Sequence, residues 1–220
     1  MKKIISFSLW GNNPKYTIGA IRNAELTNII FNGWISRFYC GLSVPNDIID
    51  KLRCIENCEV ILMDVSGNLD GAFWRFNAIS DNDVDVIISR DCDSRLGSRE
   101  KDGVDEWLNS DKLFHIMRDH PCHGIEILAG MWGVKAPLLK NMNDLVVNYN
   151  KNNFYQDDQI FLKNIIYPLV KDQSIIHDEF FNYNINKKQF PNKRDGLAFV
   201  GEIFDENENP IMEHRKMLLK

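Results

Sequence analysis

The stretch Val84-Asp85-Val86-Ile87-Ile88-Ser89-Arg90-Asp91-Cys92-Asp93 joins a short apolar run to two carboxylates that follow it directly. The run is rich in β-branched residues and predicts a buried strand. Because alternate residues of an extended chain point to the same side, Asp91 and Asp93 are expected to project together. Paired oxygen ligands suit Mg²⁺ or Mn²⁺, so the pattern predicts a divalent metal site. A solvated strand-to-loop turn is the alternative.

Strands and helices alternate along the chain on both sides of this stretch. The other expected strands cover residues 2–10, 34–40, 59–65, 113–118 and 127–134. The expected helices cover residues 16–31, 45–54, 71–78, 137–149 and 157–170, with an exposed loop and helix over 98–111. This alternation predicts an α/β fold with a mainly parallel central sheet flanked by helices. Ligands of such sheets bind beyond the carboxyl ends of the strands, where Asp91 and Asp93 are expected.

The composition of the 220 residues is that of a globular protein, with 44% hydrophobic and 26% charged residues. We expect one domain over residues 1–201, followed by a charged tail or helix over 202–220. The net charge of −5 argues against general nucleic-acid binding. No window reaches transmembrane length, and the first apolar run predicts a strand instead of a signal peptide.

The five cysteines are odd in number and scattered, which indicates a reducing compartment. We therefore expect a cytoplasmic, intracellular protein. If the protein is viral, the expected compartment is the host cytoplasm. Cys54 and Cys58, with His120, Cys122 and His123, could form a zinc site instead. The pair Cys-x₃-Cys has no second matching pair, so this alternative is the weaker one.

Four short motifs follow one another in a characteristic order: Asp91-Cys92-Asp93, Gly130-Met131-Trp132-Gly133, Asp157-Asp158-Gln159 and His177-Asp178. Their order and spacing resemble the GT-A glycosyltransferases over about Lys2 to Arg194, including small glycosyltransferase domains of large DNA viruses and bacterial polysaccharide transferases. The resemblance implies the GT-A fold, with a Rossmann-like nucleotide-binding half and an acceptor half. It also implies transfer of a sugar from a nucleotide-diphosphate sugar, UDP-sugar favoured, to a glycan or other hydroxyl acceptor, with Mn²⁺ or Mg²⁺ as cofactor.

The resemblance assigns the metal site to three residues. Asp93 is expected to bind the metal, and Asp91 to contact the ribose or metal-bound water. His177, behind an apolar segment, is expected to complete the metal sphere; the alternative is a structural histidine. A divalent cation between the two phosphates would stabilise the charge that builds on the leaving diphosphate.

Five further residues are expected to contact the nucleotide sugar. Trp10 follows the first strand, where the family contacts base and ribose. Arg75 could pair with Asp91 and hold its rotamer, or could be a surface arginine. Trp132 is expected to stack on the sugar, with a core tryptophan as the alternative. Lys193 and Arg194 are expected to clamp the diphosphate.

The catalytic group is expected at the start of the helix over 157–170. Asp158 is the candidate general base or stabiliser of the reacting sugar, and Gln159 accompanies it. Asp157 is expected to share in catalysis or to cap the helix. The pair Asp158-Gln159 fits relatives that retain the anomeric configuration somewhat better than those that invert it.

Three other classes share parts of this pattern. A haloacid-dehalogenase-like phosphatase would continue its Asp-x-Asp with Gly-Thr or Gly-Val, whereas Ser94-Arg95 follows here. A sugar nucleotidyltransferase would carry a glycine-rich basic loop after its first strand, and residues 10–15 contain a single glycine. A GT-A-like module that binds a nucleotide or glycan without turnover is the non-enzymatic alternative.

Overall fold

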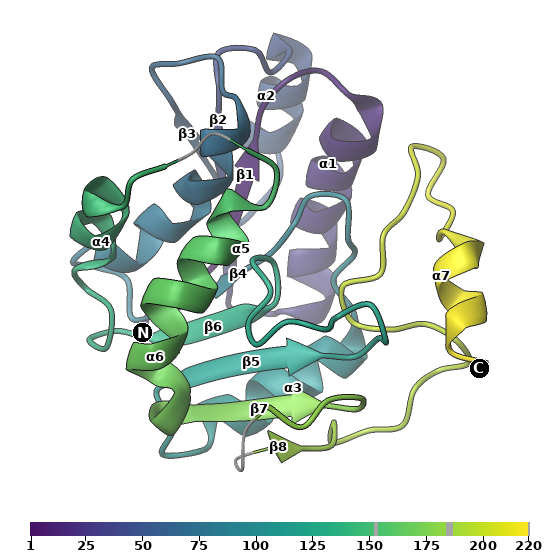
Figure 1. Cartoon of the computed structure of the whole chain (residues 1–220). Helices are drawn as coiled ribbons and strands as arrows, with labels where there is room; N and C mark the ends of the chain where they lie inside the picture. Colours follow the sequence, from purple (N-terminus) through teal and green to yellow (C-terminus); the bar gives the residue numbers. More distant parts are fainter. Residues whose placement is uncertain (152–153, 184–186, 220) are drawn as a thin grey trace.

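The computed structural model describes residues 1–151, 154–183 and 187–219. Its centre is an eight-stranded sheet with the order β3-β2-β1-β4-β6-β5-β7-β8 (Figure 1). Neighbouring strands pair in parallel except at β6, which runs antiparallel to β4 and β5. The predicted α/β fold with a mainly parallel sheet is therefore confirmed. The strands are β1 (Lys3–Leu9), β2 (Ile35–Cys40), β3 (Cys58–Leu62), β4 (Val86–Ser89), β5 (Phe114–Arg118), β6 (Trp132–Lys135), β7 (Ser174–Asp178) and β8 (Lys187–Lys188).

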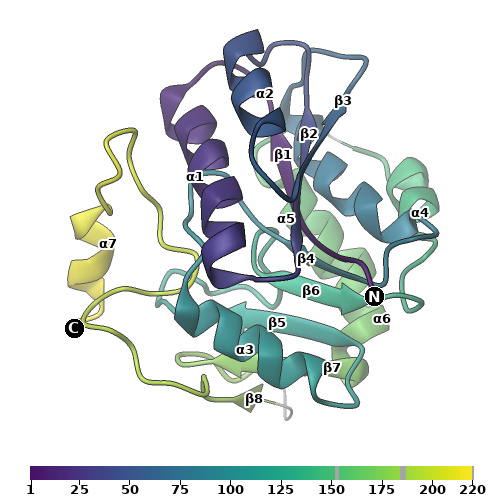
Figure 2. The same ribbon diagram turned by 180° about the vertical axis from the view of Figure 1, so that it is seen from behind.

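Helices cover both faces of the sheet. In Figure 1, α1, α2 and α3 lie behind it, and Figure 2 shows them in front. The opposite face carries α4, the continuous α5-η2-α6 segment and the 3-10 helix η1, which packs on β1. The helical segments are α1 (Pro14–Ile30), α2 (Asn46–Arg53), η1 (Leu69–Ser80), α3 (Ser98–Leu108), α4 (Met142–Asn148), α5 (Asp157–Phe161), η2 (Leu162–Ile166), α6 (Tyr167–Val170), η3 (Lys171–Gln173) and α7 (Met212–Met217).

Strand β4 supplies both hydrophobic layers. Ile87 packs into the cluster on the η1 and α5 side, whereas Val86 and Ile88 pack into the cluster under α1 and α3. All three are almost completely buried, because the strand lies between two helical layers. Burial on both faces explains why these residues are all apolar. Polar side chains follow only where the strand ends.

Two serines of β1 fix the position of η1. Ser6 Oγ donates to the carbonyl of Arg75 at 2.6 Å, and Ser8 Oγ accepts from the Arg75 backbone N–H at 3.0 Å. Both serines alternate with the apolar Ile5, Phe7 and Leu9, which face the other layer. Because alternate residues of β1 face the same side of the sheet, Ser6 and Ser8 together hold the backbone of Arg75 next to the end of β4.

Helix α1 begins beside the same strand end. The Asn13 side chain accepts from Lys15 N, and Pro14 occupies a first-turn position where its missing N–H costs nothing. In the helix, Gly19 packs so closely on the loop after β4 that an added Cβ would overlap the carbonyl of Cys92. This close approach brings the N-terminal turn of α1 to the loop that carries Asp91 and Asp93.

Several predicted boundaries differ from the structure. The strand expected over 127–134 begins only at Trp132, as β6. Before it, Ala129 O accepts hydrogen bonds from the side chains of Ser89 and Trp132 instead of from a neighbouring strand. The helix expected over 71–78 is the longer 3-10 helix η1, and that over 137–149 is shortened to α4. Strands β7 and β8 were not predicted. The residues of the expected tail form α7 and its approach, while Lys220 lies outside the described residues.

Candidate active site

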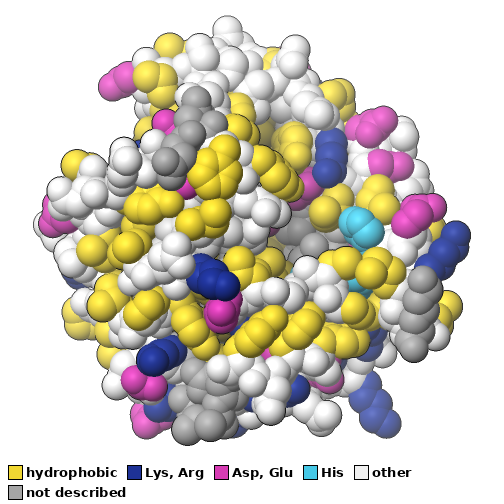
Figure 3. Space-filling view, in the orientation of Figure 1, with side chains coloured by type: hydrophobic (Ala, Val, Ile, Leu, Met, Phe, Trp, Pro, Cys, Tyr) yellow, Lys and Arg dark blue, Asp and Glu magenta, His cyan; other side chains and the backbone are white. Residues whose placement is uncertain are grey.

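A pocket of about 1040 Å³ lies beyond the carboxyl ends of β1 and β4. Its walls come from the loop after β1, the start of α1, the loop after β4, the segment before β6 and the start of α5. Figure 3 shows this face hollowed near its centre, with histidine side chains beside the hollow. Parallel α/β sheets bind ligands at this edge, so the pocket is the candidate active site.

The two carboxylates of the β4 end both line the pocket. The side chain of Asp91 is 47% exposed and that of Asp93 is 14% exposed. Burial and the nearby negative charge of Asp91 raise the pKa of Asp93. Both carboxylates lie beyond β4, which ends at Ser89, and Asp93 is in a turn, so the strand alternation predicted for them does not explain their common pocket. Each carboxylate has a different protein cation as its partner.

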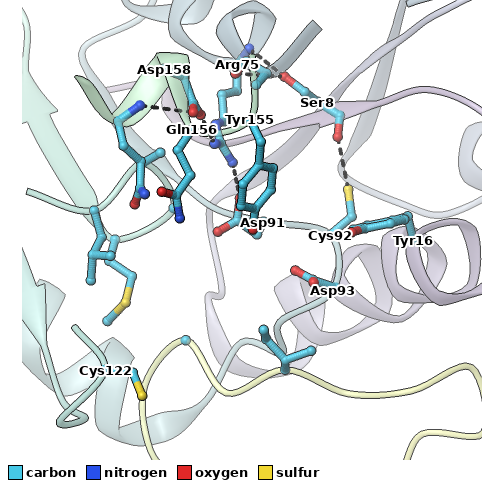
Figure 4. A pocket seen from close by; sticks show the side chains of 18 of the residues that line it. Ser8, Tyr16, Arg75, Asp91, Cys92, Asp93, Cys122, Tyr155, Gln156 and Asp158 are labelled. Carbon is cyan, nitrogen blue, oxygen red and sulfur yellow. Dashed lines mark hydrogen bonds and ion pairs between the residues drawn. The ribbon is translucent and has the colours of Figure 1, made fainter. Parts of the chain in front are cut away.

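Arg75 is the partner of Asp91. Its Nη1 donates to Asp91 Oδ1 and to the carbonyl of Arg90, and its Nη2 donates to Asp158 Oδ2 at 2.7 Å (Figure 4). The guanidinium is 5% exposed, and the charges of the two aspartates raise its pKa against the opposing effect of burial. Arg75 is thus a buried bridge between the β4 end and α5, and no surface arginine.

Gly130, before β6, lies against the other side of Asp91. An added Cβ there would overlap the Asp91 carboxylate. Only a residue without a side chain therefore leaves that carboxylate beside Arg75.

If the pocket binds UDP with Mn²⁺, as the family resemblance implies, replacing Gly130 by alanine should displace the Asp91 carboxylate and weaken that binding by about tenfold, the scale of one charge-assisted hydrogen bond. The melting temperature should change little, because the displaced side chain is half exposed. Calorimetry and thermal melts would measure both. Gly97→Ala is the matched control, since a Cβ at Gly97 meets open space. Equal UDP affinity of Gly130→Ala and wild type would contradict this role.

The start of α5 presents Asp158 to the pocket. Asp158 Oδ1 accepts from the backbone N–H of Gln159 at 2.9 Å, and both residues line the pocket. Asp157 points elsewhere: it is 2% exposed and accepts from the Tyr149 hydroxyl at 2.8 Å. Because Gln156 is the N-cap and Asp157 is the first residue inside the helix, the expected capping role of Asp157 is wrong. Of the three candidate catalytic residues, the structure brings Asp158 and Gln159 to the pocket.

Trp10 also lines the pocket, where its indole packs edge to face on Trp74 at 6.2 Å. Trp132 does not. It is 0% exposed, stacks on Phe114 at 5.3 Å and donates its Nε1 hydrogen to Ala129 O. Stacking on a sugar is therefore excluded for Trp132, and it is a core tryptophan.

His177 lies in β7, away from the pocket lining. Its Nδ1 lies 2.8 Å from His115 Nε2, and its Nε2 lies 3.1 Å from a Glu106 carboxylate oxygen. The ring is 0% exposed, and burial lowers its pKa. With both nitrogens engaged and no access to the pocket, His177 cannot share a metal with Asp93 in this structure. The sequence could not reveal its partners, which come from other elements.

The basic residues after Pro191 are also outside the pocket. Lys193 and Arg194 line a second hollow of about 590 Å³. There Arg194 donates to the buried carboxylate of Asp119 at 2.6 Å. Their expected role as a diphosphate clamp therefore has no support from their position.

One wall of the pocket holds His120, Cys122 and His123, which the sequence suggested only as zinc ligands. His120 and His123 line the pocket together with Cys122, Phe199 and His214. Burial lowers the pKa of His120, and it lowers that of His123 to about 3. His120 Nδ1 accepts from the Cys122 N–H and its Nε2 donates to His214 O. The zinc alternative also needed Cys54 and Cys58, which do not line this pocket.

Asp91 and Asp93 supply carboxylate oxygens, the kind of donor atom that Mg²⁺ and Mn²⁺ prefer. Within the described residues, no group of three or more His, Cys, Asp or Glu side chains is arranged around a common ion position. Mg²⁺ is nonetheless held in many enzymes by one or two carboxylates plus substrate phosphates and water. Two pocket carboxylates at one strand end therefore fit such a partial site, which a diphosphate would complete.

Comparison with known proteins identifies the class of fold. No protein-family model matches the chain, and no curated protein matches its sequence. A glycosyltransferase involved in glycosylation of the major capsid of PBCV-1 is similar in structure, with 17% identity, a TM-score of 0.53 and coverage of 81% of this chain and 82% of that one. The galactosyltransferase LgtC, solved with donor and acceptor sugar analogs, is also similar in structure. It shares 13% identity with a TM-score of 0.50, over 80% of this chain and 73% of that one. The fold is therefore that of the GT-A glycosyltransferases, as the resemblance implied.

The same fold also occurs outside that class. The 4-diphosphocytidyl-2C-methyl-D-erythritol synthase from Anaerococcus prevotii shares 10% identity with a TM-score of 0.55, over 84% of this chain and 92% of that one. Fold alone therefore does not separate sugar transfer from nucleotide transfer. Among the described residues, no helix has both the length and the apolar character needed to cross a bilayer.

Proposed function

We propose that the protein transfers a sugar from a nucleotide-diphosphate sugar, UDP-sugar favoured, to a hydroxyl acceptor. The observation that carries this proposal is the bridge from Asp91 through Arg75 to Asp158. It joins the strand end that suits a metal diphosphate to a carboxylate on α5 in one pocket. Donor and catalytic groups would then act on the same sugar.

Asp91 and Asp93 would hold Mn²⁺ or Mg²⁺, which supplies positive charge to a departing diphosphate. Side chains of the protein would position the reacting groups and handle the proton. Arg75 fixes the rotamers of Asp91 and Asp158 through two charge-assisted hydrogen bonds. Asp158 retains lone pairs beyond those used by Arg75 and Gln159. It can therefore take the proton from the hydroxyl group of the acceptor, or stabilise the positive charge that develops on the reacting sugar carbon.

The other wall of the pocket would receive the acceptor. His120, His123 and His214 line it together with the apolar Phe199 and Met131. Because His123 Nδ1 accepts from the Asp119 N–H at 3.0 Å, the neutral ring carries its proton on Nε2. The neutral His123 ring and the apolar surface beside it suit an uncharged hydroxyl compound such as a glycan.

The test is incubation of the purified protein with a UDP-sugar panel and Mn²⁺, with and without glycan acceptors, while UDP release is measured. Release of UDP supports sugar transfer. Consumption of a nucleoside triphosphate with release of pyrophosphate would support the nucleotidyltransferase alternative. Stoichiometric UDP binding without release of either product would support a binding module.

Replacing Asp93 by alanine should remove the gain in UDP affinity that Mn²⁺ provides, about tenfold for a bridging cation. Titration calorimetry with Mn²⁺ and with EDTA measures this gain. Asp172→Ala, at an exposed carboxylate outside the pocket, is the control and should keep it. A wild-type protein with equal UDP affinity in Mn²⁺ and EDTA would count against the metal-dependent reading.

A further inference from the structure

Lys15 occupies an unusual position at the start of α1. Its Nζ lies 2.7 Å from Asp93 Oδ2, and its side chain is 28% exposed. The ammonium group therefore contacts the carboxylate that the proposed function assigns to the metal. Both carboxylates of the β4 end are thus engaged by protein cations, Asp91 by Arg75 and Asp93 by Lys15.

The position is unfavourable for a lysine in the helix itself. The N-terminal turn of α1 carries the positive end of the helix dipole, and it contains no acidic residue. A lysine there is repelled by the dipole. Asp93, on a different element, is the compensating partner, and the ring of Tyr16, 5.2 Å from Nζ, adds a cation–π contact.

The two cation partners differ in how firmly they are held. Arg75 is 5% exposed, and its backbone is fixed by Ser6 and Ser8. Lys15 has a long flexible stem, is partly exposed and makes one carboxylate contact within the described residues. Of the two cations, Lys15 is therefore the one that can leave its carboxylate more easily.

We propose that Lys15 is a displaceable counterion of Asp93, which competes with the divalent cation in the free protein and turns to the phosphates of the nucleotide when that cation binds. The inference rests on the proposed function for its second half. Its first half concerns the protein and metal alone. Lysine is suited to this exchange because its ammonium is a compact point charge on a rotatable chain.

Lys15→Met keeps the apolar stem and removes the charge. We expect it to bind Mn²⁺ alone about tenfold more tightly than wild type, because the competing ion is gone. At saturating Mn²⁺ it should bind UDP about tenfold more weakly, because one phosphate contact is lost. Mn²⁺ binding is measured by electron paramagnetic resonance, UDP binding by calorimetry, and folding by thermal melts. Lys51→Met removes an exposed lysine that pairs with Asp47 on α2, and it is the matched control.

Each result has a separate meaning. Unchanged Mn²⁺ affinity in folded Lys15→Met would overturn the competition, even if UDP binds normally. Tighter Mn²⁺ binding with unchanged UDP affinity would overturn the transfer of Lys15 to the phosphates. If wild type binds Mn²⁺ but no UDP, the proposed function fails, while the comparison of Mn²⁺ affinities still decides the competition. Lys15→Gln, a polar replacement, must behave like Lys15→Met if the charge is the cause.

Discussion

Asp158→Asn is expected to lower kcat by about 100-fold or more, the usual scale for the loss of a positioned general base or charge stabiliser. The amide keeps the size of the side chain but has one acceptor oxygen, so it can keep the hydrogen bond from Arg75 Nη2 or that from the Gln159 N–H, which reach different oxygens of Asp158. UDP-sugar affinity should therefore stay within about threefold of wild type, since the lost charge acts on the transition state. Steady-state kinetics with the turned-over donor, or slow donor hydrolysis, would measure the effect.

Asp157→Asn is the comparison. Asp157 contacts Tyr149 and does not line the pocket, so its replacement should change stability more than kcat. Burial and the Asp157 contact raise the pKa of Tyr149 to about 12, so the phenol remains a donor across the neutral range. If Asp157→Asn loses turnover and Asp158→Asn keeps it, the two roles are exchanged. Full activity of both variants would exclude the start of α5 as the catalytic element.

The sequence predicted the parts of the site that depend on local periodicity. An apolar run followed by Asp91 and Asp93 predicts a strand end, and the alternation of elements predicts which edge of the sheet that end occupies. Asp158 lies in the first turn of a helix that the sequence predicts. Asp91, Asp93 and Asp158 all line the pocket. Their chemical roles stay predictions.

The residues that the sequence misplaced depend on contacts between distant elements. Trp132 has the same neighbours in sequence whether it faces a ligand or Phe114, and only the register of β6 against β5 decides between them. His177 belongs to β7, whose parallel pairing with β5 brings it to His115. Long-range strand register is not encoded in a local pattern, so both residues look equally functional in the sequence.

The pocket wall formed by His120, His123, Phe199 and His214 shows a second limit of what the sequence could predict. His120 and His214 lie 94 positions apart, yet the Nε2 hydrogen of one donates to the carbonyl of the other at 2.9 Å. The C-terminal segment reaches the pocket because Phe204 N donates to Asp93 O at 2.9 Å and Arg215 pairs with Glu202. Residues 202–220, expected as a charged tail or helix, thus contribute Ile203 and His214 to the pocket lining.

The network around Arg75 is also expected to stabilise the fold. Asp158 is 7% exposed, so removal of Arg75 would leave its carboxylate buried without its cation. Breaking a buried pair by removing one partner typically costs about 3–5 kcal/mol. The Asp91 half adds less, because that side chain is 47% exposed and water can solvate it.

Arg75→Met should therefore lower the free energy of unfolding by about 3 kcal/mol or more, measured by urea denaturation. The double variant Arg75→Met with Asp158→Leu should recover part of this loss, because no buried charge remains. Arg53→Met is the control: Arg53 pairs with Asp50 on the surface, and its loss should change stability by less than about 0.5 kcal/mol. Arg75→Lys keeps the charge but cannot reach both carboxylates, so it should be intermediate. If Arg75→Met unfolds at the same urea concentration as wild type, the bridge between β4 and α5 does not support the fold, and Asp158 must be held at the pocket by the α5 backbone alone.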